Sequence, residues 1–385
     1  MKESKFKAIF TLKQHTPIIH FQSEQSGATL RATELKPKFD SFLKQYAFDG
    51  EVPREYLIDK DKDALDYKVK IISSQLETKR IEKRNHKGKD INNPLFFGNM
   101  KPKNMSSDEF EKIRKKFQIH KTTFDIEFFT FNTQLKSIIE EQFESFLANT
   151  NFGTRQSKGF GSFYVADSNF NKKLIKHKLY SFTTKNWEKD IGLLYQFLRQ
   201  GINLPNRDDS TRFYSKPAIF SYAKSRDWQW DKKSIKEKYF SNALKEQIKK
   251  HNNDILTYSK TESKYLLRDL FGLSSSQEWK SYNRTIEKEN SDIERFKSPI
   301  TFKVIDNIVY FWADNSVENI LDTTFKIKAG NRQDLELSTP SEFSFDDFFA
   351  FTFKIDLSRH IEPKYHSQSE YQTLVKIFNN VKASL

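Results

Sequence analysis

The sequence predicts an α+β protein whose first domain has the ferredoxin-like element order βαββαβ. Over residues 1–170, apolar residues alternate as in strands or recur at helical spacing in that order. Residues 171–295 show mostly helical spacing, and residues 296–385 return to strand-like alternation. We therefore expect an N-terminal ferredoxin-like domain, a mostly helical middle region and a smaller C-terminal α+β domain.

Each element of the first domain follows from its local spacing. The predicted strands are residues 5–12, 67–71, 124–130 and 162–165, and the predicted helices are residues 28–46 and 135–147. Pro37 fits near the start of the first helix, where its missing N–H group would have had no helical partner.

A glycine-rich loop, residues 151–163, connects the second predicted helix to the fourth strand. It holds 3 of only 11 glycines in 385 residues, namely Gly153, Gly159 and Gly161. Glycine permits positive φ and the close approach of another backbone. Arg155 and Lys158 place two cations in the loop. The loop is therefore either a site where a phosphodiester backbone approaches or a glycine turn with two solvated charges.

A basic insertion, residues 74–121, separates the second and third strands. Six of its cations lie between Lys79 and Lys89, among them Lys83 and Arg84, and Leu95-Phe96-Phe97-Gly98 follows. Cations that track phosphates and rings that stack on bases suit single-stranded nucleic acid. A solvated insertion without a ligand fits the pattern equally well.

Later elements are predicted in the same way. Helices are expected within residues 190–200, 234–251 and 266–273, and Trp228-Gln229-Trp230 suggests a core or interface anchor. Asp306-Asn307 between two alternating runs predicts a hairpin. Phe351, Phe353, Ile355 and Leu357 alternate strictly and predict a further strand.

The charge balance favours a polyanionic partner. Lys and Arg number 65 against 51 Asp and Glu, a net charge of +14. Richness in Lys and Phe is also typical of an AT-biased genome, which would give basic charge without function. The absence of cysteine excludes disulfides and thiolate zinc sites. With no apolar run long enough to span a membrane and no signal segment after Met1, we expect a cytoplasmic protein.

The sequence contains no strong constellation of catalytic residues. No Walker loop is present, and no histidine has a metal-binding spacing, so we expect neither metal nor cofactor. Asp59, Asp61 and Asp63 begin like a calcium loop that the following residues do not complete. His20 is a weak candidate for a base that takes a 2′-hydroxyl proton. A histidine that is solvated or merely touches RNA is the favoured alternative, so we expect no enzyme.

Several of these segments resemble the RAMP superfamily of CRISPR-associated proteins. The superfamily loop Gly-x-Arg-x-x-Arg/Lys-Gly-x-Gly is matched by Gly153, Arg155, Lys158, Gly159 and Gly161. The other matching segments are His15-Thr16-Pro17, residues 30–36, the Leu-Phe-Gly elements at 95–98 and 270–273, and residues 295–300.

The resemblance implies tandem ferredoxin-like, or RRM-like, domains in an RNA-binding subunit of an antiviral type III effector ribonucleoprotein. It is greatest for the two-domain terminal subunit of the type III-B complex. Implied partners are guide RNA, target RNA or both, together with other effector subunits, and the loop's cations and glycine amides would hold phosphates. The residues expected to contact RNA are Arg31, Lys83, Arg84, Gly153, Arg155, Lys158, Gly159, Phe160 and Gly161.

Two other functions stay open. The superfamily also includes a metal-independent endoribonuclease that processes precursor guide RNA, whose glycine loop usually lies near the end of its second domain. Here more than 200 residues follow the loop, which favours the effector subunit. The third possibility is a structural protein whose basic surface reflects genome bias alone.

Overall fold

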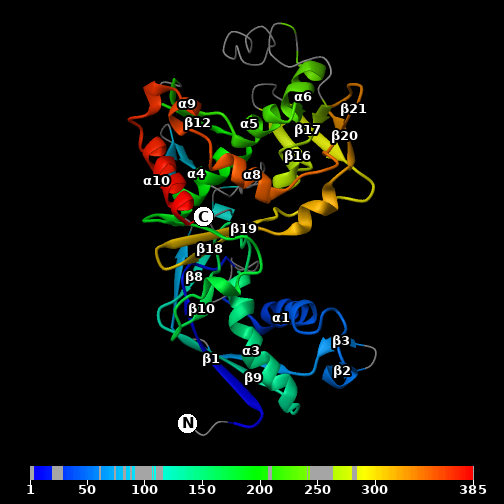
Figure 1. Ribbon diagram of the computed structural model, residues 1–385, viewed down its shortest axis with the longest axis vertical. Coiled ribbons are helices and arrows are strands. Elements are labelled where there is room, and N and C mark those ends of the chain that lie inside the picture. The colour runs from blue at the N-terminus through cyan, green and yellow to red at the C-terminus, as the bar shows by residue number, and fades with distance from the viewer. Residues whose placement is uncertain are drawn as a thin grey trace. The chain divides into compact units, whose positions relative to one another are not determined.

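A four-stranded antiparallel sheet forms the centre of the first of two units in the computed structural model (Figure 1). Its order is β10-β1-β9-β4, with β1 at Lys7–Gln14, β4 at Lys68–Ile72, β9 at Phe124–Phe129 and β10 at Phe163–Val165. Helix α1, Ala32–Tyr46, lies between β1 and β4 in sequence, and α3, Thr133–Asn149, lies between β9 and β10. Apart from short added strands, this is the element order βαββαβ predicted for this part of the chain.

The structure describes residues 4–19, 29–59, 62–72, 75–80, 84–86, 89–91, 106, 108–109, 116–206, 210–240, 242, 263–279 and 284–384. Three added hairpins belong to the first unit. They pair β2 (Leu57–Asp59) with β3 (Lys62–Leu65), β5 (Leu76–Arg80) with β8 (Lys116–His120), and β6 (Arg84–His86) with β7 (Lys89–Ile91). The 95–98 element lies outside the described residues.

Aromatic side chains form the core between the sheet and its two helices. Phe39 of α1 has its ring centroid 4.8 Å from that of Phe146 and 5.3 Å from that of Phe143, both on α3, and 5.6 Å from that of Phe128 on β9. All four side chains are almost completely buried. Burying a phenylalanine contributes about 1.5–3 kcal/mol, so this cluster fixes both helices on one face of the sheet.

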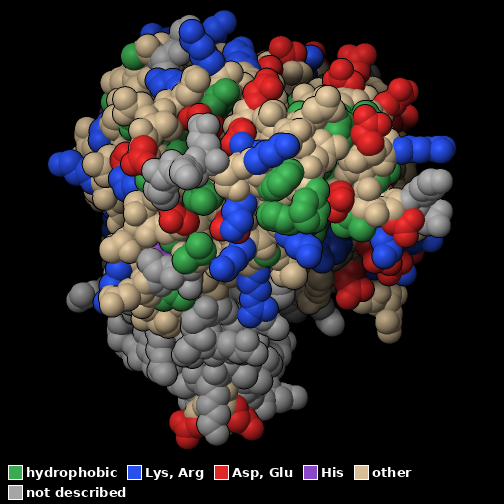
Figure 2. All heavy atoms as spheres, turned by 90° about the horizontal axis from the view of Figure 1, so that it is seen from below, with side chains coloured by type: hydrophobic (Ala, Val, Ile, Leu, Met, Phe, Trp, Pro, Cys, Tyr) green, Lys and Arg blue, Asp and Glu red, His purple; other side chains and the backbone are tan. Residues whose placement is uncertain are grey.

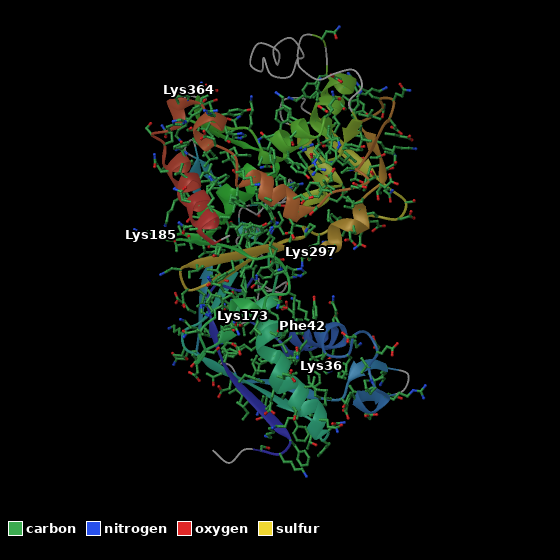
Figure 3. All side chains as sticks on the ribbon, in the orientation of Figure 1. Lys36, Phe42, Lys173, Lys185, Lys297 and Lys364 are labelled. Carbon is green, nitrogen blue, oxygen red and sulfur yellow. The ribbon has the colours of Figure 1, made fainter. Side chains whose placement is uncertain are left out.

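Lys36, labelled in Figure 3, ties α1 to the adjoining strands. Its Nζ donates to Asp40 Oδ2 at 2.8 Å and to the carbonyl of Leu65 at 2.9 Å, and it lies 4.1 Å from the ring centroid of Tyr67. A cation beside an aromatic face is stabilised by the ring quadrupole. Lys36 therefore links the polar edge of α1 to Leu65 and Tyr67.

The predicted Asp306-Asn307 hairpin is confirmed, but it belongs to the first unit. Strands β18 (Ile300–Ile305) and β19 (Ile308–Ala313) pair in the sheet β11-β19-β18, where β11 is Tyr180–Thr183. Asp306 has φ +50°, as a tight two-residue hairpin requires. The first unit comprises Met1–Ile191 and Thr301–Trp312, so the expected boundaries at 170 and 296 do not separate compact units.

The second unit comprises Gly192–Ile300 and Ala313–Leu385. Its six-stranded mixed sheet has the order β14-β15-β21-β20-β17-β16. The strands are β14 (Trp228–Trp230), β15 (Ser263–Tyr265), β16 (Ser276–Trp279), β17 (Arg284–Glu289), β20 (Thr324–Lys328) and β21 (Leu335–Ser338). A separate hairpin, β12 (Ile202–Pro205) with β13 (Thr211–Ser215), precedes them in the sequence. Within the described part of this unit, the four-stranded order of the first sheet does not recur.

Helices and 3-10 turns complete the chain. The helices are α4 (Trp187–Arg199), α5 (Ala218–Ser225), α6 (Asp231–Tyr239), α8 (Phe345–Thr352), α9 (Leu357–His360) and α10 (Ser369–Ser384), and the 3-10 turns are η1 (Arg54–Tyr56), η2 (Lys172–Leu174), η4 (Asp269–Phe271), η5 (Asn315–Ile320) and η6 (Pro363–Tyr365). None of the helices in the described ranges is long and apolar enough to cross a membrane.

Two secondary-structure predictions are corrected. The described part of the middle region is not mostly helical, because β11 to β17 lie within residues 171–295. The strand expected from Phe351 to Leu357 is instead the end of α8 and the beginning of α9. Ser344 accepts a hydrogen bond from the N–H of Asp347, and Asp356 accepts one from the N–H of Ser358. These two N-caps fix helix starts that the alternation of apolar residues conceals.

Candidate functional site

The glycine-rich loop has the backbone that its sequence predicts. Gly153, Gly159 and Gly161 have φ values of +78°, +87° and +66°. A Cβ on Gly161 would lie 1.9 Å from the carbonyl oxygen of Phe152, and one on Gly153 would lie 2.7 Å from the carbonyl oxygen of Ile19. Glycine is therefore required both by the dihedral angles and by the approach of neighbouring backbone.

Arg155 also adopts the left-handed conformation, with φ +60°. A residue with a Cβ pays about 1–2 kcal/mol for this conformation. The turn is closed by a hydrogen bond of 2.8 Å from the N–H of Lys158 to the carbonyl of Arg155. The strained turn holds the Arg155 side chain in an exposed position.

Lys158 and Phe160 lie in the interior, which corrects the expectation that both would face RNA. Lys158 is 9% exposed, and its Nζ lies 6.0 Å from the ring centroid of Phe302 on β18. Phe160 is completely buried, with its ring centroid 4.9 Å from that of Trp187 in an edge-to-face arrangement. Both side chains pack the loop against the protein.

The glycine amides bind the protein itself, which corrects their expected role as phosphate donors. The N–H of Gly153 donates to Glu34 Oε1 at 2.6 Å, that of Gly161 to the carbonyl of Pro17 at 2.8 Å, and that of Gly159 to the carbonyl of Gln156 at 3.3 Å. The three glycine amides thus hold the shape of the loop and are not the groups that would contact a ligand.

Lys303 fastens both ends of the loop, a residue that the sequence-based prediction missed. Its Nζ donates to the carbonyls of Thr150 and Phe163 at 3.1 and 3.2 Å and to Asn151 Oδ1 at 3.3 Å. The side chain is fully buried, and burial lowers its pKa to about 7. The available signal was a single lysine inside the apolar run that forms β18.

The start of α1 lies against the same loop. Lys38 Nζ donates to Glu34 Oε1 at 3.0 Å, to the carbonyl of Asn151 at 3.1 Å and to Gln156 Oε1 at 2.8 Å. Arg31 is the N-cap residue of α1, half-buried, and its side chain makes no capping hydrogen bond. The structure therefore brings Arg31 and Arg155, far apart in sequence, to neighbouring elements joined through Glu34.

Three of the predicted site residues receive no side-chain description. His20 and Lys83 lie outside the described residues, and Arg84 lies in β6 without a described side chain. Their roles remain predictions.

The described histidines near the loop are buried and neutral. Burial lowers the pKa of His15 to about 4, and its Nδ1 accepts a hydrogen bond of 3.1 Å from the N–H of Asp306. Burial also lowers the pKa of His120 to about 4, and its ring stacks on Phe124 with centroids 4.0 Å apart. Over the described ranges, no three His, Asp or Glu side chains gather as metal ligands.

Two domain models match the chain in tandem. The Cmr1 N-terminal domain matches residues 5–204, and the Cmr1 C-terminal domain matches residues 214–383. The chain belongs to the Cmr1 family. The resemblance to the RAMP superfamily is thereby confirmed. The N-terminal match contains the complete glycine loop and α1, whereas hairpin β18-β19 falls in the C-terminal match.

The similarity to individual proteins is low. A crystal structure of Cmr1 from Pyrococcus furiosus in its apo form matches over 90% of this chain and 96% of that chain, with 11% identity and a TM-score of 0.32. No curated protein matches the chain. Membership of the Cmr1 family therefore rests on the two domain models.

Proposed function

We propose that this chain is an RNA-binding subunit of a type III-B CRISPR effector complex. Membership of the Cmr1 family supports its place in such a complex, with other effector subunits as partners. The observation that carries the RNA-binding part is Arg155, an exposed arginine held in a strained left-handed turn of a rigid loop. Backbone strain at an exposed cation is typical of a functional position.

The groups around Arg155 favour an anion. The Glu34 carboxylate, which would repel phosphate, is engaged by the Gly153 amide and by Lys38. Arg31 adds a second guanidinium at the start of α1. Guanidinium groups bind phosphate through paired, charge-assisted hydrogen bonds. We infer that Arg155 and Arg31 contact RNA phosphates while the buried part of the loop fixes their positions.

A nuclease function is the second candidate and has less support. A general base must reach the 2′-hydroxyl of its substrate. The candidate base His20 lies outside the described residues, and the described histidines near the loop, His15 and His120, are buried with their pKa values lowered to about 4. The proposal is accordingly a protein that binds RNA without cutting it.

Single-stranded RNA titrated into the full chain tests this function. Arg155→Ala should weaken binding by about tenfold or more, since a hydrogen bond to a charged group contributes about 1.5–3 kcal/mol. The slope of log K against log salt should fall by about 0.7, the value for one phosphate contact on a single strand. Fluorescence anisotropy of end-labelled RNA at several salt concentrations gives both numbers.

Arg54→Ala is the matched control. Arg54 is exposed in the same unit but lies in η1, beyond the opposite end of α1 from the loop. Because α1 has 15 residues, its ends are about 22 Å apart. Equal losses in the two variants would reject a local site, and cleavage of the labelled RNA by the purified chain would favour the nuclease.

A further inference from the structure

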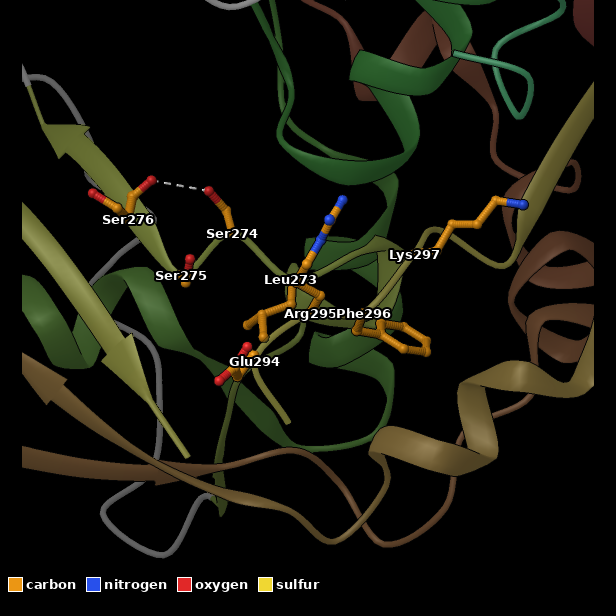
Figure 4. Close-up of a pocket in the computed structure, with 8 residues that line it drawn as sticks. All are labelled: Leu273, Ser274, Ser275, Ser276, Glu294, Arg295, Phe296 and Lys297. Carbon is orange, nitrogen blue, oxygen red and sulfur yellow. Dashed lines mark hydrogen bonds between the residues drawn. The ribbon is translucent and has the colours of Figure 1, made fainter. Parts of the chain in front are cut away.

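An open pocket of about 650 Å³ lies within the second unit (Figure 4). It is lined by residues 273–276, which lead into β16, and by residues 294–297, which follow β17. Both segments contain motifs singled out in the sequence, the second Leu-Phe-Gly element and the segment that begins at Arg295. Neither motif takes part in the function proposed for the glycine loop.

The backbone fixes the crossing of these two segments. The N–H of Leu273 donates to the carbonyl of Phe296 at 3.0 Å. Gly272 has φ +117°, and a Cβ there would lie 3.2 Å from the amide nitrogen of Ser298. On the other side, Arg199 Nη2 donates to the carbonyl of Gly272 at 3.0 Å. The pocket wall is therefore built on fixed backbone.

Arg295 provides the pocket's positive charge. In Figure 4 its guanidinium points into the space beside Ser274, the Glu294 carboxylate points the opposite way, and the Lys297 side chain extends away. Arg295 is exposed. The ion pairs of the described second unit engage other cations, and none of them involves Arg295.

Two consecutive amides lie in the same wall. Within the described part of the chain, the backbone N–H groups of Ser274 and Ser275 donate to no acceptor, although the carbonyl of Ser275 accepts from the N–H of Lys288 at 2.8 Å. The Ser274 hydroxyl donates to the carbonyl of Ser276 at 3.1 Å. Backbone amides and guanidinium groups both donate hydrogen bonds to phosphate oxygens.

We propose that this pocket binds the phosphate group of a nucleotide. Arg295 and the amides of Ser274 and Ser275 hold the phosphate, and the half-buried ring of Phe296 contacts the base. The volume lies in the range of pockets that enclose small organic ligands. The site is separate from the glycine loop, so a test of this pocket does not depend on the proposed RNA contact at Arg155.

Calorimetric titration of the full chain with AMP tests the proposal. Arg295→Ala should weaken binding by about tenfold or more, because it removes a charge-assisted contact. Glu294→Gln should strengthen it by about twofold, because it removes a nearby repulsive charge. Arg359→Ala is the matched control, since Arg359 is 90% exposed on α9, outside the pocket, and should leave the constant unchanged.

Two further ligands identify the group that is recognised. Adenosine should bind much more weakly than AMP. Weaker competition by inorganic phosphate than by AMP supports a nucleotide, whereas inorganic phosphate that competes as well as AMP would overturn the nucleotide and assign the site to free phosphate. Equal binding of adenosine and AMP, or an unchanged constant in a folded Arg295→Ala variant, would overturn the proposal.

Discussion

At the scale of single residues, Gly161 is the position where the loop depends most on the absence of a side chain. An added Cβ would meet the carbonyl oxygen of Phe152 at 1.9 Å, and that backbone is itself bonded to Gly161, because the N–H of Phe152 donates to its carbonyl at 3.0 Å. Neither partner can move without opening the loop.

We therefore predict that Gly161→Ala destabilises the first unit far more than Gly50→Ala. Gly50 has φ +89° with nothing within 4 Å of the added Cβ, so its variant pays only the dihedral cost of about 1 kcal/mol. Gly161→Ala adds a backbone clash and should cost at least about 3 kcal/mol in total. Urea denaturation of both variants measures the difference, and similar midpoints would contradict the clash.

Residue types and spacing predicted part of this loop. Positive φ followed from the glycines and is confirmed at all three. The burial of Lys158 and Phe160 could not be predicted, because it depends on Phe302 and Trp187, which pack from segments remote in sequence. The sequence motif treats Arg155 and Lys158 alike, yet only the first is exposed.

At the scale of elements, local patterns predicted strands and helices where alternation or helical spacing ran through a single segment. Asp306-Asn307 correctly predicted the hairpin β18-β19. Alternation failed at 351–357, because these residues run from the end of α8 through the connection 353–356 into α9, so their spacing of two belongs to no single element. Where the hairpin packs was not predictable either, since that depends on contacts such as the 2.7 Å bond from Ser162 Oγ to the carbonyl of Val304.

The lysine on β18 makes a prediction about pH. Lys303 has a pKa of about 7 in the fold, against about 10.4 for a lysine in an unfolded chain. Between these values the unfolded state binds more protons, so the folded state gains stability as pH rises, by up to about 1.4 kcal/mol per pH unit. We expect this gain to be larger in the wild type than in Lys303→Met, where buried lysines such as Lys232, whose pKa is lowered to about 8, still contribute.

Urea denaturation between pH 7 and 9 measures the effect. The difference in free energy of unfolding between wild type and Lys303→Met should change with pH. The loss of the three Lys303 hydrogen bonds adds a constant to this difference and does not change its dependence on pH. Parallel curves for the two proteins would show that the buried ammonium does not lose its proton in this range.

At the scale of the whole molecule, the two units are interleaved along the chain. Figure 2 shows Lys and Arg side chains interspersed with Asp and Glu on the face in view, so the net charge of +14 is not gathered there into one basic surface. The family models divide the chain between residues 204 and 214, yet Thr301–Trp312 completes the first unit. Sequence order thus did not reveal which segments share a core.

This interleaving predicts that a fragment of residues 1–209, which contains the whole N-terminal family match, does not fold as it does in the full chain. Removing β18 leaves Asn151 Nδ2 without its 2.8 Å bond to the carbonyl of Phe302 and the loop ends without Lys303. It also removes Ile305, Tyr310 and Trp312 from the core of the first unit. Buried polar groups left unpaired cost about 1–3 kcal/mol each, and the lost apolar burial adds to that cost.

Near-ultraviolet circular dichroism and thermal unfolding should show weak tertiary structure in the fragment, and adding residues 210–385 in trans should restore it. A fragment that unfolds cooperatively at the melting temperature of the full chain would mean that β18-β19 is an accessory to the first unit and not part of its core.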